Sequence, residues 1–184
     1  MSNRKLHFET IQIHGGYKVD ESLARGIAIH PTAAYHFSSC DYAANLFTLS
    51  EPGYIYTRLH NPTTAAYEER IAALYGGVGA LATASGMSAI LLTVTALANA
   101  GDNIVASPYL YGGTHNQFVI SLRNLGVECR LAESDSAEDI AKLVDERTRA
   151  IFAESMGNPT CRVLDIEAVA KVAHANRIPL IIDN

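Results

Sequence analysis

The sequence predicts an α/β fold: a mostly parallel sheet that is flanked by helices. Short apolar segments, among them 104–106, 150–153 and 180–182, alternate with segments of helical periodicity about every 23 to 30 residues. Short strands that are apolar on both faces are typical of a parallel sheet with helices on each side. With 184 residues and 48% hydrophobic content, the chain can fill the core of such a domain.

The first long helix is expected to begin at Asn61. Its side chain can cap the helix, Pro62 suits the first helical position, and the glycine pair 76–77 ends the helical pattern. Residues 80–84 then read as a short strand.

The later elements follow the same alternation. They are a helix from 85 to about 98, a strand at 104–106, a helix at 114–125, a strand at 127–131, a helix from 136, a strand at 150–153, a helix from 165 and a strand at 180–182. Ser136, followed by Asp139 in a capping-box-like pattern, and Asp165 are the expected helix caps.

Residues 1–60 differ from the rest of the chain because they show no sustained periodicity. They contain the breakers Pro31, Pro52 and Gly53. A long irregular segment of this kind is usually functional or packs on a neighbour. We therefore expect an N-terminal arm at 1–60 that contacts a neighbouring subunit, and a partial α/β domain at 61–184.

Composition excludes several classes of protein. A net charge of −5 with scattered basic residues argues against nucleic acid or an anionic membrane as a partner. The polar start of the chain shows no signal peptide, and the apolar stretch 86–100 is too short to span a bilayer. Three widely spaced cysteines and seven histidines without a metal-binding pattern predict a reduced, cytoplasmic protein with no metal site.

Two acidic residues stand where predicted strands end. Asp183 follows the apolar segment 180–182, and Glu154 follows 150–153. The carboxyl ends of parallel strands share one edge of a sheet, where ligands bind. A carboxylate buried there needs a donor or a cation, so we expect Asp183 to meet a cationic group and Glu154 a second donor.

Ser85, Gly86 and Met87 lie at a predicted junction between a strand and a helix. The helix N-terminus offers free N–H groups to a phosphate, and a glycine lets the ligand approach closely. The alternative is a tight turn that needs a small residue. Tyr111, after another strand, could stack on a planar ligand or could simply be packed under a loop.

Two further segments could complete a cofactor site. Tyr56 and Arg58 share a face if their segment is extended and could clamp a phosphate, and Asn158 offers an amide on a rigid turn. A phosphate seat, a stacking aromatic ring and a carboxylate for a ring nitrogen are together what pyridoxal phosphate requires.

The chain also resembles a known family through several short segments. They are Tyr54–Arg58 with Asn61–Thr63, Ala84–Met87, Leu110–Thr114, Glu154–Pro159 and Ile182–Asn184. In order and spacing they are similar to the Cys/Met-metabolism group of pyridoxal-phosphate enzymes, which includes cystathionine γ-synthase, cystathionine lyases, methionine γ-lyase and O-acetylhomoserine sulfhydrylase.

The resemblance implies a role for each of these segments. The backbone of Gly86 and Met87, next to Ser85, would hold the cofactor phosphate. Tyr111 would stack on the ring and act as an acid–base group, and Asp183 would pair with the ring nitrogen.

The remaining segments have implied roles as well. Asn158 would lie near the ring oxygen. Glu154 would hold residues that contact the cofactor without contacting the cofactor itself. Tyr56 and Arg58 would reach the cofactor of a neighbouring subunit in a dimer of dimers.

Within the group, segments such as Glu154–Pro159 resemble the O-acetylhomoserine sulfhydrylases most, although Met87 is more typical of lyases and synthases. This branch implies replacement of the γ-substituent of O-acetylhomoserine, its acetoxy group, by sulfide or a thiol. A γ-lyase, a cystathionine γ-synthase and a catalytically dead subunit are the alternatives. The resemblance also implies a cofactor-binding lysine and a C-terminal domain beyond Asp183. Because neither is present in the 184 residues, we expect this chain alone to be inactive.

Overall fold

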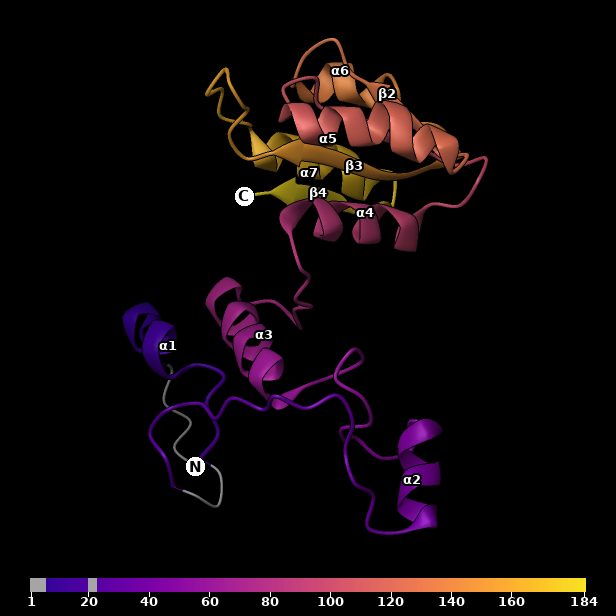
Figure 1. The fold of residues 1–184 in the computed structure, drawn as a ribbon. Helices are drawn as coiled ribbons and strands as arrows, with labels where there is room; N and C mark the ends of the chain where they lie inside the picture. The colour runs from indigo at the N-terminus through magenta and orange to yellow at the C-terminus, as the bar shows by residue number, and fades with distance from the viewer. Residues whose placement is uncertain (1–5, 20–22) are drawn as a thin grey trace. The chain divides into compact units, whose positions relative to one another are not determined.

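The computed structural model describes residues 6–19 and 23–184, which form two compact units (Figure 1). The first unit is Met1–Ala82 and the second is Thr83–Asn184. The sequence placed a boundary after residue 60 instead. The structure differs because helix α3 (Pro62–Tyr75) packs on helix α1 (Phe8–His14) and so belongs to the first unit.

Two helices of the first unit lie in the segment that showed no periodicity. They are α1 and α2 (Cys40–Phe47), with seven and eight residues. Helices of two turns contain too few apolar positions to produce a periodic pattern. The N-cap of α2 was readable, since Ser39 Oγ accepts a hydrogen bond from the Tyr42 N–H at 3.0 Å.

The expected start and end of α3 are confirmed. The Asn61 side chain accepts a hydrogen bond from the Thr63 N–H at 2.8 Å, and Pro62 occupies the first turn. Gly76 ends the helix with a left-handed backbone at φ 65°. The same Asn61 amide donates to the His30 carbonyl at 3.0 Å and so ties the preceding extended chain to the helix.

The first unit has a small core. Among the described residues, its buried apolar side chains are Leu46, Ala65 and Ala66. Large apolar side chains remain exposed on all of its helices, for example Phe8, Phe47 and Tyr75. A surface of this kind usually marks an interface.

The second unit contains the predicted parallel sheet (Figure 1). Its strands are β1 (Asn103–Ala106), β2 (Glu128–Leu131), β3 (Thr148–Glu154) and β4 (Leu180–Asp183). They lie in the order β2-β1-β3-β4, and every pair is parallel. The α/β prediction is confirmed.

Helices cover both faces of this sheet. One face packs on α4 (Gly86–Leu97), α5 (Gly112–Asn116) and the π-helix η1 (Gln117–Leu122), and the other packs on α6 (Ala137–Ala141) and α7 (Ile166–Ala175). On the first face, the rings of Phe118 and Phe152 meet edge to face with centroids 4.8 Å apart. Alternate residues of β1, β3 and β4 enter the two cores, as the pleat requires.

The strand expected at 80–84 is wrong, because this segment has no regular structure. A strand requires a neighbour with which to exchange hydrogen bonds, and none of the four strands of the described sheet pairs with it. The Ala82 N–H instead donates to the Glu68 carboxylate at 2.7 Å.

The two predicted caps in the second unit are present. The Asp165 carboxylate accepts from the Ala168 N–H at 3.0 Å, and Ser136 Oγ accepts from the Asp139 N–H at 3.1 Å. The Asp139 carboxylate, however, receives hydrogen bonds from Ser134 and Lys142, each at 2.6 Å. Only half of the expected capping box is formed.

No helix among residues 6–19 and 23–184 is long and apolar enough to cross a membrane. All three cysteine thiols are free, and burial raises the pKa of Cys129 to about 12.

An acid-sensitive network joins the first residues of β1 and β3 to Arg130 of β2. The Asp145 carboxylate accepts hydrogen bonds from the buried Asn103 amide at 2.9 Å and from Arg130 at 2.6 Å, and also from Thr148 at 3.2 Å. The bonds from Asn103 and then from Arg130 lower the pKa of the Asp145 carboxyl. Its pKa in the folded state therefore lies below its value in the unfolded chain, about 4.

This network gives a prediction for stability against pH. Because the folded pKa is lowered, the stabilising contribution is complete above about pH 4 and is lost as the pH falls further. In Asp145→Asn the decline of the free energy of unfolding below about pH 4 should be shallower than in the wild type. Urea titrations at several acidic pH values measure this decline. The exposed neighbour Glu146 supplies the control Glu146→Gln, and equal declines in the wild type and Asp145→Asn would contradict the assignment.

Candidate active site at the strand ends

The carboxyl ends of β3 and β4 bring two of the predicted residues together. Glu154 and Asp183 are register partners in the parallel pair, so their side chains lie on the same face of the sheet. Residues Phe152 and Ile181, two positions earlier in each strand, contact the core beneath α4 and η1. Both carboxylates therefore belong to the face that carries these two helices.

Glu154 supports the loop that follows β1. It is 9% exposed, and its Oε1 accepts a hydrogen bond from the Tyr111 N–H at 2.6 Å. The donor that the sequence required for this carboxylate is thus a backbone amide. The bond fixes the backbone of Tyr111, the residue directly before α5.

Tyr111 presents its ring to the outside of the unit. The side chain is 52% exposed, so it is not packed under a loop. The ring lies against Gly113, where an added Cβ would come within 2.5 Å of a ring carbon. A glycine at 113 is therefore needed for this ring position, and the free ring face is available to a planar ligand.

The junction at Ser85 forms the N-terminus of α4. Ser85 Oγ accepts from the Ser88 N–H at 3.1 Å, while the Gly86 and Met87 N–H groups bind no acceptor in the part of the chain that the structure describes. A Cβ added at Gly86 would meet no atom within 4 Å, and its backbone is not left-handed. The turn itself does not need a glycine. The free space at this position instead suits the close approach of an anion.

The expectation that Asp183 is buried is wrong, because the residue is exposed. Strand β4 lies at one edge of the sheet, and no described element covers its last residue. An exposed carboxylate does not require a cation, so burial gives no argument for a charged ring. A role for Asp183 is instead supported by its position beside Glu154, on the face of the sheet that carries α4.

Asn158 lies on the loop after β3 and is exposed, with a cis peptide bond to Pro159. This loop packs on the loop after β1, where an added Cβ on Gly157 would approach Tyr109 Cβ to 2.9 Å. The Arg162 guanidinium lies 4.8 Å from the centroid of the Tyr109 ring. Asn158 is thus held near the loop that carries the predicted aromatic residue.

Tyr56 and Arg58 belong to the first unit, whereas the other predicted residues belong to the second. Their side chains would share a face in an extended segment, but the chain turns after Tyr56, whose carbonyl accepts from the Leu59 and His60 N–H groups at 2.9 and 3.0 Å. The Arg58 guanidinium still lies 5.6 Å from the centroid of the Tyr56 ring. Both side chains are exposed.

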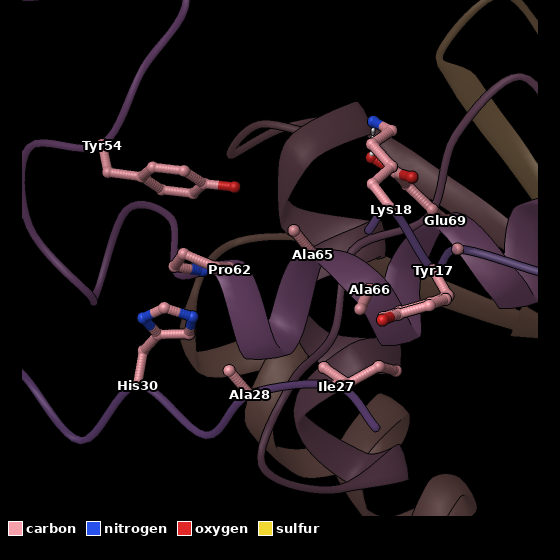
Figure 2. A pocket seen from close by; sticks show the side chains of 11 residues that line it. Tyr17, Lys18, Ile27, Ala28, His30, Tyr54, Pro62, Ala65, Ala66 and Glu69 are labelled. Carbon is pink, nitrogen blue, oxygen red and sulfur yellow. Dashed lines mark hydrogen bonds and ion pairs between the residues drawn. The ribbon is translucent and has the colours of Figure 1, made fainter. Parts of the chain in front are cut away.

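A separate pocket in the first unit contains none of the predicted residues (Figure 2). Tyr17, His30 and Tyr54 line it together with α3, and the ion pair between Lys18 and Glu69, at 2.7 Å, lies at its side. The Tyr17 hydroxyl is buried without a partner among the described residues.

Two residues that were not predicted from the sequence contact the α4 N-terminus. Gln117 Nε2 donates to the Met87 carbonyl at 3.1 Å, and the buried Thr114 hydroxyl lies 3.9 Å from the Met87 sulfur. Their spacing of three residues on a helix was the available signal, because it places two polar side chains on one face.

The residues of the second unit fit the requirements of a phosphorylated, cationic ring. The α4 N-terminus offers N–H groups to a phosphate, Tyr111 offers a ring face, and Asp183 offers a carboxylate. A family model described as Cys/Met metabolism PLP-dependent enzyme matches residues 9–184. The chain belongs to this family.

Two relatives belong to one branch of the family. The chain is 48% identical over 179 residues to a homocysteine synthase of Schizosaccharomyces pombe and 49% identical over 181 residues to O-acetyl-L-homoserine sulfhydrylase 1 of Thermus thermophilus. Each match covers 97% of this chain, with 42% and 43% of the respective relative. The chain therefore spans about two fifths of the length of these proteins.

Solved structures of two enzymes agree with the family assignment. A Campylobacter jejuni protein described as an O-acetylhomoserine (thiol)-lyase, whose structure contains N'-pyridoxyl-lysine-5'-monophosphate, matches with a TM-score of 0.95 and 37% identity. That match covers 98% of this chain and 44% of the other. A cystathionine gamma-lyase from Lactobacillus plantarum matches with a TM-score of 0.87 and 32% identity, over 97% of this chain and 45% of the other.

Proposed function

We propose that the complete protein is a pyridoxal-phosphate enzyme that replaces the γ-acetoxy group of O-acetylhomoserine by sulfide or a thiol, releasing acetate and yielding homocysteine or methionine. Identities of 48% and 49% to a homocysteine synthase and an O-acetyl-L-homoserine sulfhydrylase support this branch. The cofactor, when bound, supplies an electron sink for charge that develops beside the amino-acid α-carbon.

The observation that carries the proposal is the combination at the α4 N-terminus. The Gly86 and Met87 N–H groups have no acceptor among the described residues, and a Cβ added at Gly86 would meet no atom within 4 Å. In the proposed site these N–H groups bind the cofactor phosphate, and Ser85 orders the turn through its bond to Ser88.

The other residues orient the ring and handle protons. Tyr111 would stack on the ring and exchange a proton with the leaving group, and Glu154 holds Tyr111 in place through the 2.6 Å bond to its N–H. Asp183 would keep the ring nitrogen protonated. Asn158 would lie near the ring oxygen.

The first unit has a role between subunits in this proposal. Its small core and exposed apolar side chains support an interface with a neighbouring subunit, in a homotetramer built as a dimer of dimers. Arg58 and Tyr56, close to each other and exposed, would reach the phosphate of the neighbour's cofactor. We place the enzyme in the cytoplasm and expect the 184-residue chain alone to be inactive.

A γ-lyase is the second candidate, supported by the structural match to a cystathionine gamma-lyase. Product analysis separates the two functions. The complete protein, incubated with O-acetylhomoserine and sulfide, should form homocysteine and acetate in equal amounts. Accumulation of an α-keto acid and ammonia would instead indicate the lyase. Both functions would be refuted if the complete protein showed no absorbance band from bound cofactor, of the kind that borohydride removes.

A further inference from the structure

We propose that Gln117 is a positioning residue that fixes the phosphate-binding turn 85–87 relative to Tyr111. This inference rests on the proposed function. Gln117 begins η1, which continues α5, the helix that starts directly after Tyr111. One continuous helical segment thus connects the ring-binding residue to the side chain that contacts the phosphate seat.

The contact holds Met87 at its peptide bond. Gln117 Nε2 donates to the Met87 carbonyl at 3.1 Å, and the N–H of the same peptide, on Ser88, donates to Ser85 Oγ at 3.1 Å. Both ends of this peptide group are therefore fixed by side chains. The neighbouring N–H groups of Gly86 and Met87, which would bind the phosphate, take their direction from this turn.

The buried hydroxyl of Thr114 reinforces the contact. Thr114 is 1% exposed, and its Oγ1 lies 3.9 Å from the Met87 sulfur. Together Thr114 and Gln117 hold Met87, the second residue of α4, against the α5–η1 segment. π-helical turns within helices often occur at functional sites.

The amide oxygen of Gln117 indicates that packing of the core does not require an amide at this position. Its Oε1 is buried without a hydrogen-bond partner among the described residues. An unpaired buried acceptor is unfavourable, so an apolar side chain of similar size should be tolerated by the fold. The contribution of the amide is then the single bond to Met87.

Loss of that bond should affect the phosphate more than the ring. In the complete protein, Gln117→Met should weaken the affinity of the apoenzyme for pyridoxal phosphate roughly tenfold, the effect of losing one hydrogen bond at the turn. The affinity for pyridoxal, which lacks the phosphate, should stay within about twofold. Absorbance titrations of the apoenzyme with each compound measure both values.

Asn116→Met is the matched control, because Asn116 is the preceding amide and is exposed. It should change neither affinity. Gln117→Leu replaces Gln117→Met if the latter does not fold. Equal losses for both compounds would show a general structural role, and unchanged affinities would remove the contact from cofactor binding. Wild-type apoenzyme that binds no pyridoxal phosphate would refute the proposed function itself.

Discussion

Asp183→Asn is expected to lower the turnover number of the complete enzyme by about 10² to 10³-fold. Asparagine keeps the size of the side chain at the end of β4 but removes the charge that would keep a ring nitrogen protonated. Without a protonated ring the cofactor is a weaker electron sink. The measurement is homocysteine formation at saturating O-acetylhomoserine and sulfide.

Asp165→Asn provides a matched control for this substitution. Asp165 caps α7 through the Ala168 N–H, and asparagine is an equally good cap, so neither stability nor turnover should change appreciably. A normal turnover number for Asp183→Asn would refute the role given to Asp183. If that variant loses secondary structure, the absorbance spectrum of the cofactor bound to its folded fraction becomes the deciding measurement.

Gly86→Ala should weaken cofactor binding without weakening the fold. An added Cβ would meet no protein atom within 4 Å, and alanine is the better helix former, so the free energy of unfolding should stay equal or rise by about 0.5–1 kcal/mol. The methyl group would occupy space next to the N–H groups that bind the phosphate. We expect the dissociation constant for pyridoxal phosphate to rise at least about tenfold, or about 1.4 kcal/mol.

Gly79→Ala tests whether any new methyl group has this effect. Gly79 also has no atom within 4 Å of an added Cβ, and it lies outside the proposed site. Its affinity for the cofactor should equal that of the wild type. Unchanged affinity in Gly86→Ala, measured on the complete enzyme, would mean that no ligand approaches the α4 N-terminus closely.

Much of the fold was readable because local signals and burial agree in the second unit. Strands such as β1 and β3 are apolar on both faces, and residues such as Ser136 and Asp165 cap helices in the expected way. Signals failed where pairing or length decides the structure. Residues 80–84 look like a strand but have no neighbour in the described sheet, and α1 and α2 are too short for a pattern.

The site was predictable to the extent that it follows from strand ends. The shared edge of Glu154 and Asp183 follows from a parallel sheet and was confirmed by their register. The exposure of Asp183 could not be read from its sequence neighbours, because it depends on which elements cover β4. The contact of Gln117 with Met87 joins segments thirty positions apart, which no local pattern encodes.

The protonation state of the cofactor ring in the complete protein tests the central claim most directly. Reconstitution with pyridoxal phosphate labelled with ¹⁵N in the ring allows nuclear magnetic resonance to report whether that nitrogen carries a proton. A protonated nitrogen above neutral pH in the wild type, and an unprotonated one in Asp183→Asn, is the expected result. An unprotonated nitrogen in the wild-type enzyme would contradict the assignment of the β4 carboxylate.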